Sequence, residues 1–118
     1  MNTIPLRGDF VKRYIKCKTT AKWEKEASDR YNLYEGNDWI ASVYKKKAAF
    51  GMVRWYAQTE NYTSVWDTLA EAKQGAIRNI EIEAQGRVED MQRMEYTSEE
   101  MAEECKVNPY LRYMGISL

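Results

Sequence analysis

The residues that could perform chemistry are few and widely spaced in this sequence. Ser42 and Lys45 match the SxxK spacing of a serine nucleophile and its lysine base, but the companion SDN and KTG elements are missing. The chain contains no histidine, no Walker loop and no GxGxxG turn. A dense acidic group lacks the loop and glycine of a calcium site, and it consists of Glu99, Glu100, Glu103 and Glu104. We therefore expect no catalytic centre, no metal site and no cofactor.

The two cysteines, Cys17 and Cys105, lie far apart and form no CxxC pair. Without histidine they cannot complete a mixed zinc site, so reduced thiols are the expected state. No apolar run approaches the roughly 20 residues that cross a bilayer, and the opening MNTIPLRGDF does not resemble a signal peptide. We expect a cytoplasmic protein with no membrane partner.

Charge is distributed unevenly along the chain although the formal net charge is zero. Residues 1–56 carry 12 Lys and Arg against 6 Asp and Glu, a net charge of +6, and residues 57–118 carry 6 against 12, a net charge of −6. Such an asymmetry indicates separate basic and acidic faces. The two halves either attract each other or present a basic surface to a partner.

A β-meander is the element best placed to present side chains to a partner. The turn residues Gly36-Asn37-Asp38 precede three predicted strands, WIASVYKK, GMVRWYA and YTSVW. The loop between the first two contains Lys45, Lys46, Lys47 and Gly51. Alternation places Trp39, Ala41 and Val43 on one face with Val53, Trp55 and Ala57, and Ile40, Ser42 and Tyr44 on the other with Met52, Arg54 and Tyr56.

A long helix is predicted to follow the meander. Thr68-Leu69-Ala70-Glu71 has the form of a capping box, and an apolar stripe then runs at helical spacing from Leu69 to Met91. Gly86 either ends or bends this helix. A second capping box at 97–100 predicts a short helix from Glu99 to about Lys106, which the Asn108-Pro109 pair ends. The apolar tail YLRYMGISL is expected to pack on the body.

The amino-terminal third is harder to interpret. Residues 21–31, AKWEKEASDRY, place Trp23, Ala27 and Tyr31 four apart with charges between them, which predicts a short amphipathic helix. Residues 9–18 fit a strand or a helix, and we favour the strand. The predicted fold class is α+β, an antiparallel meander of three or four strands packed on a long helix, with short flanking helices, in one domain of 118 residues.

Residues 39–80 resemble the amino-terminal module of AP2 and integrase proteins. The resemblance lies in the order W-x-A-x-V, a basic turn, a second aromatic strand, a third strand ending in W-D-T, and then LAEAK. In that family three strands precede a helix and the exposed sheet face reads DNA. The resemblance implies DNA-facing positions at Tyr44, Arg54 and Tyr56, with Lys45, Lys46 and Lys47 on the phosphates. The acidic second half of the chain would repel a phosphate backbone.

The short length, the three-strand-and-helix layout and the aromatic content also resemble small accessory proteins of bacteriophages and other mobile elements. Such proteins commonly occupy a host protein or nucleoprotein complex, as inhibitors of restriction or CRISPR systems do. Our leading hypothesis is a non-catalytic interaction protein that binds and inhibits such a target. The expected partner-binding residues are Tyr44, Lys45, Lys46, Lys47, Arg54 and Tyr56. Nucleic-acid binding is the alternative, and small-molecule binding in an aromatic pocket is a third.

Overall fold

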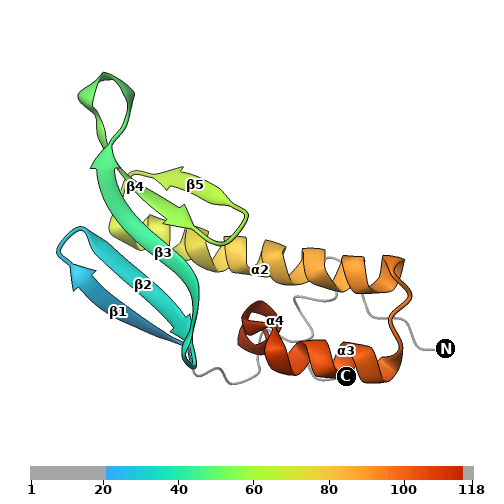
Figure 1. Cartoon of the computed structure of the whole chain (residues 1–118). Helices are drawn as coiled ribbons and strands as arrows, with labels where there is room; N and C mark the ends of the chain where they lie inside the picture. Colours follow the sequence, from blue (N-terminus) through green and yellow to red (C-terminus); the bar gives the residue numbers. More distant parts are fainter. Residues whose placement is uncertain (1–20, 116–118) are drawn as a thin grey trace.

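The computed structural model describes residues 21–115, which form a five-stranded antiparallel sheet followed by three helices (Figure 1). The strands follow one another in chain order: β1 Lys22–Ala27, β2 Arg30–Glu35, β3 Asp38–Lys47, β4 Val53–Gln58 and β5 Thr63–Trp66. A single 3-10 turn, η1 Ala49–Gly51, lies between β3 and β4. The helices are α2 Leu69–Arg93, α3 Ser98–Val107 and α4 Pro109–Tyr113. The predicted α+β class is confirmed, while the strand predicted over residues 9–18 lies outside the described residues.

The short helix predicted over residues 21–31 is wrong, because this segment forms β1, a turn and the start of β2. The spacing of four between Trp23, Ala27 and Tyr31 would place them on one helical face. Trp23 and Tyr31 also share one face of the β1–β2 hairpin, where Lys73 of α2 lies 5.3 and 4.7 Å from their ring centroids. Ser28 and Asp29 supply the turn. Pairing of β2 with β3 therefore overrides the local helix preference and extends the predicted meander to five strands.

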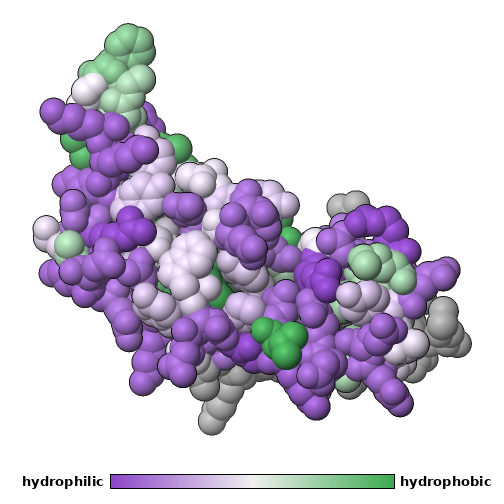
Figure 2. Space-filling model, viewed as in Figure 1, coloured by the Kyte–Doolittle hydropathy of each residue, from purple (hydrophilic) through white to green (hydrophobic). Residues whose placement is uncertain are grey.

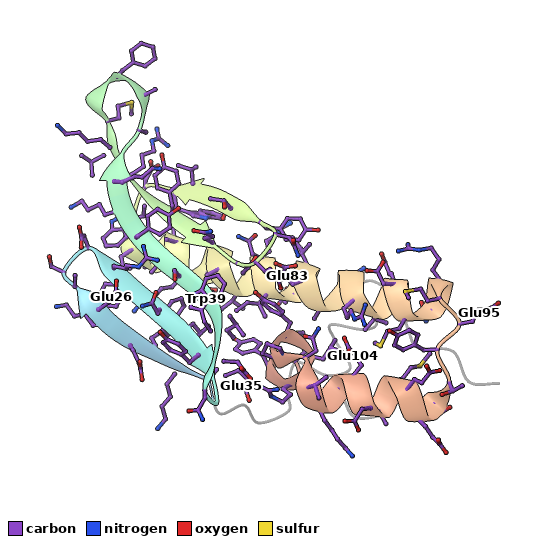
Figure 3. All side chains as sticks on the ribbon, in the orientation of Figure 1. Glu26, Glu35, Trp39, Glu83, Glu95 and Glu104 are labelled. Atoms are coloured by element: carbon purple, nitrogen blue, oxygen red, sulfur yellow. The ribbon has the colours of Figure 1, made fainter. Side chains whose placement is uncertain are left out.

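A bulge in β3 changes the predicted sorting of side chains at Trp39. Leu33 pairs with Ala41 but Tyr34 pairs with Trp39, so Ile40 is an extra residue in β3. The alternation predicted that Trp39 shares a face with Ala41 and Val43. The bulge makes this prediction wrong. Its indole Nε1 instead donates to the Ser42 hydroxyl, 2.7 Å away (Figure 3).

Helix α2 packs along β3, β4 and β5 and covers one face of the sheet (Figure 1). Thr68 caps its start by accepting a hydrogen bond from the Glu71 amide. The predicted stripe faces the sheet, although Leu69 and Ile77 are only half-buried. The helix continues past Gly86 to Arg93, so this glycine does not end it. The fully buried members of the stripe are Ala72, Ala76, Ile80, Ala84, Val88 and Met91.

The C-terminal helices close the end of the core away from the β3–β4 hairpin (Figure 1). Thr97 and Glu100 form the predicted capping box of α3, and Asn108 caps α4. In α4, Tyr110 and Leu111 are buried, which confirms the predicted packing for residues 110–115, the described part of this tail. The Tyr110 hydroxyl donates to the Ile40 carbonyl at 3.0 Å, and burial raises the pKa of Tyr110 to about 12. None of the helices in residues 21–115 is long and apolar enough to cross a membrane.

Gly75 allows α2 to lie close to the Trp66 ring of the sheet. A Cβ at this position would lie 2.2 Å from the indole Nε1 of Trp66, the last residue of β5. The same indole nitrogen donates to Ser64 at 2.7 Å, which fixes the ring against the helix. Gly86 lies on the same helix, and a Cβ there would meet nothing within 4 Å.

Replacing Gly75 by alanine should lower the free energy of unfolding by about 1–3 kcal/mol, because the added methyl group must displace the Trp66 ring. Gly86→Ala is the matched control and should raise it by about 0.5–1 kcal/mol through the better helix propensity of alanine. Urea unfolding monitored by far-UV circular dichroism measures both. Stabilisation by both substitutions would show that Trp66 does not pack on Gly75.

Candidate functional site: the outer face of the sheet

The surface of the sheet opposite α2 is the candidate site, and we call it the outer face. In residues 21–115 no helix lies over it (Figure 1). Residues paired across antiparallel strands share a face, and the pairs Arg30–Tyr44, Tyr44–Tyr56, Tyr56–Val65 and Lys46–Arg54 all lie here. The outer face is therefore defined by Arg30, Tyr44, Lys46, Arg54, Tyr56 and Val65.

A stack of aromatic rings and cations forms the centre of the outer face. The rings of Tyr44 and Tyr56 lie 5.6 Å apart between centroids at an interplanar angle of 10°. The Arg30 guanidinium lies 5.2 Å from the Tyr44 centroid, and the Lys46 ammonium lies 5.2 Å from that of Tyr56. Each cation is attracted to the negative ring face it covers. The stack holds four side chains from three strands in one arrangement before any partner binds.

Two of the cations on the outer face are already paired with carboxylates. Arg30 Nε lies 3.1 Å from Glu26 Oε2, and Arg54 Nη1 lies 3.2 Å from Asp67 Oδ1. Both pairs are substantially solvent-exposed, so each contributes little to stability. They nevertheless lower the positive potential of the face, because each guanidinium is balanced by a neighbouring negative charge.

The six predicted site residues do not all lie together. The three lysines belong to β3 rather than to a loop, and they alternate in direction along the strand. Lys46 joins the outer face, whereas Lys45 pairs with Trp55 and Lys47 pairs with Val53 on the side of α2. Lys45 lies 5.9 Å from the centroid of the Trp55 ring. The structure therefore brings together Tyr44, Lys46, Arg54 and Tyr56 and separates Lys45 and Lys47 from them.

Polar side chains on the outer face form a hydrogen-bonded network beside the stack. The Ser42 hydroxyl accepts from Trp39 and donates to Asn32 Oδ1 at 2.6 Å. Asn32 Nδ2 in turn donates to Glu26 at 3.3 Å, and Glu26 pairs with Arg30. Ser42 is fully buried in this network, and Lys45 points to the opposite side of the sheet. The SxxK match therefore does not place an amine next to the hydroxyl.

The turn between β4 and β5 is held to the helices. Glu83 of α2 is buried and accepts from the Asn61 amide at 2.6 Å and from Asn61 Nδ2 at 2.8 Å (Figure 3). The Glu60 amide donates to the Tyr110 hydroxyl at 3.0 Å. These contacts hold the β4–β5 turn, which joins two strands of the outer face, against α2 and α4.

The other groups that could take part in chemistry have structural roles or lie at the surface. Burial raises the pKa of the Cys105 thiol, which keeps it protonated near neutral pH. In the predicted acidic group Glu100 closes the α3 cap and Glu104 pairs with Arg87. No group of three or more His, Cys, Asp or Glu that could hold a metal occurs within residues 21–115. A groove of about 540 Å³ lies along α2 and is lined by Trp66, Gln74, Gly75, Ile77, Arg78, Glu81, Ile82 and Gln85.

Three residues on or near the site were not among the site residues predicted from the sequence. The sequence pattern predicts a helix that ends near Arg30, and the position of Arg30 opposite Tyr44 follows only from the β2–β3 pairing. Val65 is 48% exposed, and the alternation along YTSVW, opposite to Ser64 and Trp66, could have found it. Phe50 is fully exposed in the turn between β3 and β4, and its position beside Gly51 was the available signal.

Comparison with known proteins found no matching family model, no matching curated protein and no matching solved structure.

The stacked tyrosines should be energetically coupled. In a double-mutant cycle, Tyr44→Ala and Tyr56→Ala should show a coupling of about 0.5–1.5 kcal/mol in the free energy of unfolding, because each ring loses the same contact. Tyr44→Ala combined with Tyr113→Ala of α4 is the control and should be additive. Additivity in the Tyr44–Tyr56 cycle would mean that the stack is absent in solution.

Proposed function

We propose that this protein is a non-catalytic interaction protein that docks its outer face on a host protein or nucleoprotein complex. Proteins of this kind are encoded by bacteriophages and mobile elements, and inhibition by occlusion is the expected consequence of binding. The observation that carries the proposal is the preformed stack of Arg30, Tyr44, Tyr56 and Lys46 on the outer face. Tyrosine and arginine are among the residues that dominate the energetics of protein interfaces.

The preorganised conformation of these side chains supports a protein partner. Preorganised aromatic rings lose little conformational entropy on binding, which leaves more of the contact energy for affinity. Val65, directly opposite Tyr56 and 48% exposed, adds an apolar contact at the edge of the stack. The neighbouring pairs Arg30–Glu26 and Arg54–Asp67 offer charges of both signs, as the polar rim of a protein interface does.

Nucleic-acid binding is the second candidate, favoured by the consecutive lysines Lys45, Lys46 and Lys47 of β3. Two features weaken it. Phosphates would compete with Glu26 and Asp67 for the two arginines, and the outer ring faces that bases would stack on are covered by Arg30 and Lys46. Small-molecule binding remains a third candidate, for which the groove beside Trp66 is the place to look.

The partner-binding test begins with affinity purification from the native host, followed by titration of the captured partner. Tyr56→Ala should weaken binding by at least about 2 kcal/mol, which is about 30-fold, if Tyr56 is a buried anchor of the interface. Tyr62→Ala is the matched control, since this tyrosine is 43% exposed on the β4–β5 turn and lies outside the stack. Equal losses for the two variants would exclude the outer face as the docking surface.

Salt dependence separates the first two candidates. For a protein partner, Arg54→Ala should change mainly the association rate. For DNA, the logarithm of affinity should fall linearly with the logarithm of salt, by about 0.9 for each phosphate contact. Gel shifts and partner titrations on wild type and Arg54→Ala across a salt series measure both. Tight DNA binding with a steep salt slope that Arg54→Ala abolishes would favour the AP2-like alternative.

Any effect on the partner's activity should be stoichiometric. An inhibitor that acts by occupying a surface reaches its full effect when the partner is saturated, whereas an enzyme acts at ratios far below one. Titrating the partner's activity at concentrations well above the dissociation constant should give a sharp equivalence point. Full inactivation at a small fraction of one equivalent would refute the non-catalytic assignment.

A further inference from the structure

The β3–β4 hairpin ends in an apolar tip, which consists of Ala48, Ala49, Phe50, Gly51, Met52 and Val53. Phe50 is 101% exposed, Met52 is 52% exposed and Val53 is 50% exposed. Figure 2 shows hydrophobic residues gathered at this end of the molecule, with hydrophilic residues around the base of the hairpin. Several large apolar side chains thus meet solvent together on a projection rather than singly on the surface.

Folding does not account for the phenylalanine at this position. Phe50 has φ 63°, in the left-handed region where glycine, asparagine and aspartate are favoured, and Gly51 follows with φ 77°. Its ring is fully exposed, so it adds nothing to the core. Asparagine at this position would suit the backbone better and would expose less apolar surface. The side chain is therefore available for a contact outside the described chain.

Four cations surround the base of the tip, and we call Lys45, Lys46, Lys47 and Arg54 the basic collar. Lys46 and Arg54 lie opposite each other on the outer face, where Asp67 balances the charge of Arg54, whereas Lys45 and Lys47 point to the other side of the ribbon. Positive charge therefore lies on both sides of the hairpin at nearly the same height. The acidic residues of α3 lie at the opposite end of the molecule, whose longest axis extends 54 Å (Figure 1).

We propose that the apolar tip inserts into the interfacial region of an anionic lipid bilayer, with the basic collar on the lipid headgroups. A bilayer surrounds an inserted loop on every side, which suits apolar residues that point in several directions and cations on both faces. The acidic end would point away from the negative surface and orient the approach. Lys46 and Arg54 of the collar also belong to the outer face, but the apolar tip, Lys45 and Lys47 do not, so this inference does not depend on the proposed function.

Two other partners fit these observations less well. A side chain that wedges between DNA base pairs is a single apolar group beside a charged groove, and it would leave Met52 and Val53 unburied. A protein socket would have to enclose the hairpin on both faces and carry acidic groups around its whole rim. This proposal departs from the expectation of no membrane partner, which rested on the lack of a spanning segment. The absence of a spanning helix within residues 21–115 does not bear on insertion of this kind, because the tip enters only the interface. The cytoplasmic leaflet supplies the required negative surface.

Vesicle flotation tests the role of Phe50. Vesicles of phosphatidylcholine with about 30% phosphatidylserine should bind the wild-type protein reversibly, and pure phosphatidylcholine vesicles should bind it much more weakly. Phe50→Asn should weaken binding to the anionic vesicles about tenfold or more, since the largest inserted side chain is removed. Asparagine tolerates the left-handed backbone, so circular dichroism and the thermal midpoint should show an intact fold.

Met94→Asn is the matched control, because Met94 is 60% exposed but lies at the far end of α2. It should leave vesicle binding unchanged. Lys45→Gln combined with Lys47→Gln should weaken binding and reduce its salt dependence, and neither residue belongs to the outer face. The charge-matched control is Lys25→Gln combined with Lys106→Gln, which removes two exposed lysines elsewhere.

Three outcomes would overturn the proposal. The wild type does not float with the anionic vesicles, or Phe50→Asn floats as well as the wild type, or Met94→Asn loses binding equally. A fourth measurement uses a short DNA duplex as the probe. Duplex binding that Phe50→Asn abolishes, in a protein that does not bind the vesicles, would assign the tip to a DNA groove instead.

Discussion

The close approach of α2 to the sheet is the constraint on which the rest of this structure depends. Small residues face one another across the interface, Ala41 and Ala57 from the sheet and Ala72 and Ala76 from the helix, all fully buried. Gly75 continues this surface and gives space for the Trp66 ring. Dispersion attraction falls steeply with separation, so a helix that lies close to the sheet gains attractive contacts with β3, β4 and β5 at the same time. One face of the sheet is thereby committed to the core.

Polar contacts at the edge of this interface then determine how rigid the other face is. Asn79 of α2 donates to the Ala57 carbonyl at 3.3 Å and to the Ser64 hydroxyl at 3.2 Å, and Glu83 accepts from both nitrogens of Asn61. Helix α2 therefore holds β4 and β5 by directed bonds as well as by packing. A buried polar group that loses its partner is costly, so these bonds disfavour sliding of the strands. The spacing of the stacked tyrosines on the outer face depends on the position of β4 relative to β3, which these contacts with α2 help to hold.

The sequence predicted the parts of the fold that depend on local pattern and missed those that depend on pairing. The capping residues Thr68 and Thr97 and the stripe of α2 were readable because caps and helical periodicity are local signals. The spacing of Trp23, Ala27 and Tyr31 fits a helix, but a β1–β2 hairpin also places Trp23 and Tyr31 on one face. The pairing of β2 with β3 favours the hairpin over the helix, and this pairing is not a local signal. The bulge at Ile40 is likewise a result of packing, and no local residue preference marks it.

The candidate site was predictable to the same extent. Alternation predicts Tyr44, Arg54 and Tyr56 on one face, as the structure shows, whereas a loop over the three lysines predicts no direction for their side chains. Once β3 is known to reach Lys47, the same alternation separates Lys46 from its two neighbours. Arg30 could not be placed without the β2–β3 register, and the ion pair between Arg54 and Asp67 required the β4–β5 pairing.

The length of the β3–β4 hairpin connects these features to the basic half of the chain. Strand β3 has ten residues and β4 has six, and their pairing extends to Lys47 and Val53 at the base of the tip. Val43 is buried under α2, yet Lys45 and Lys47, two and four residues further on the same side, are exposed. Lysine is tolerated on this inner side only because the helix no longer covers the strand there. The part of the hairpin that extends beyond α2 therefore carries positive charge on both of its sides.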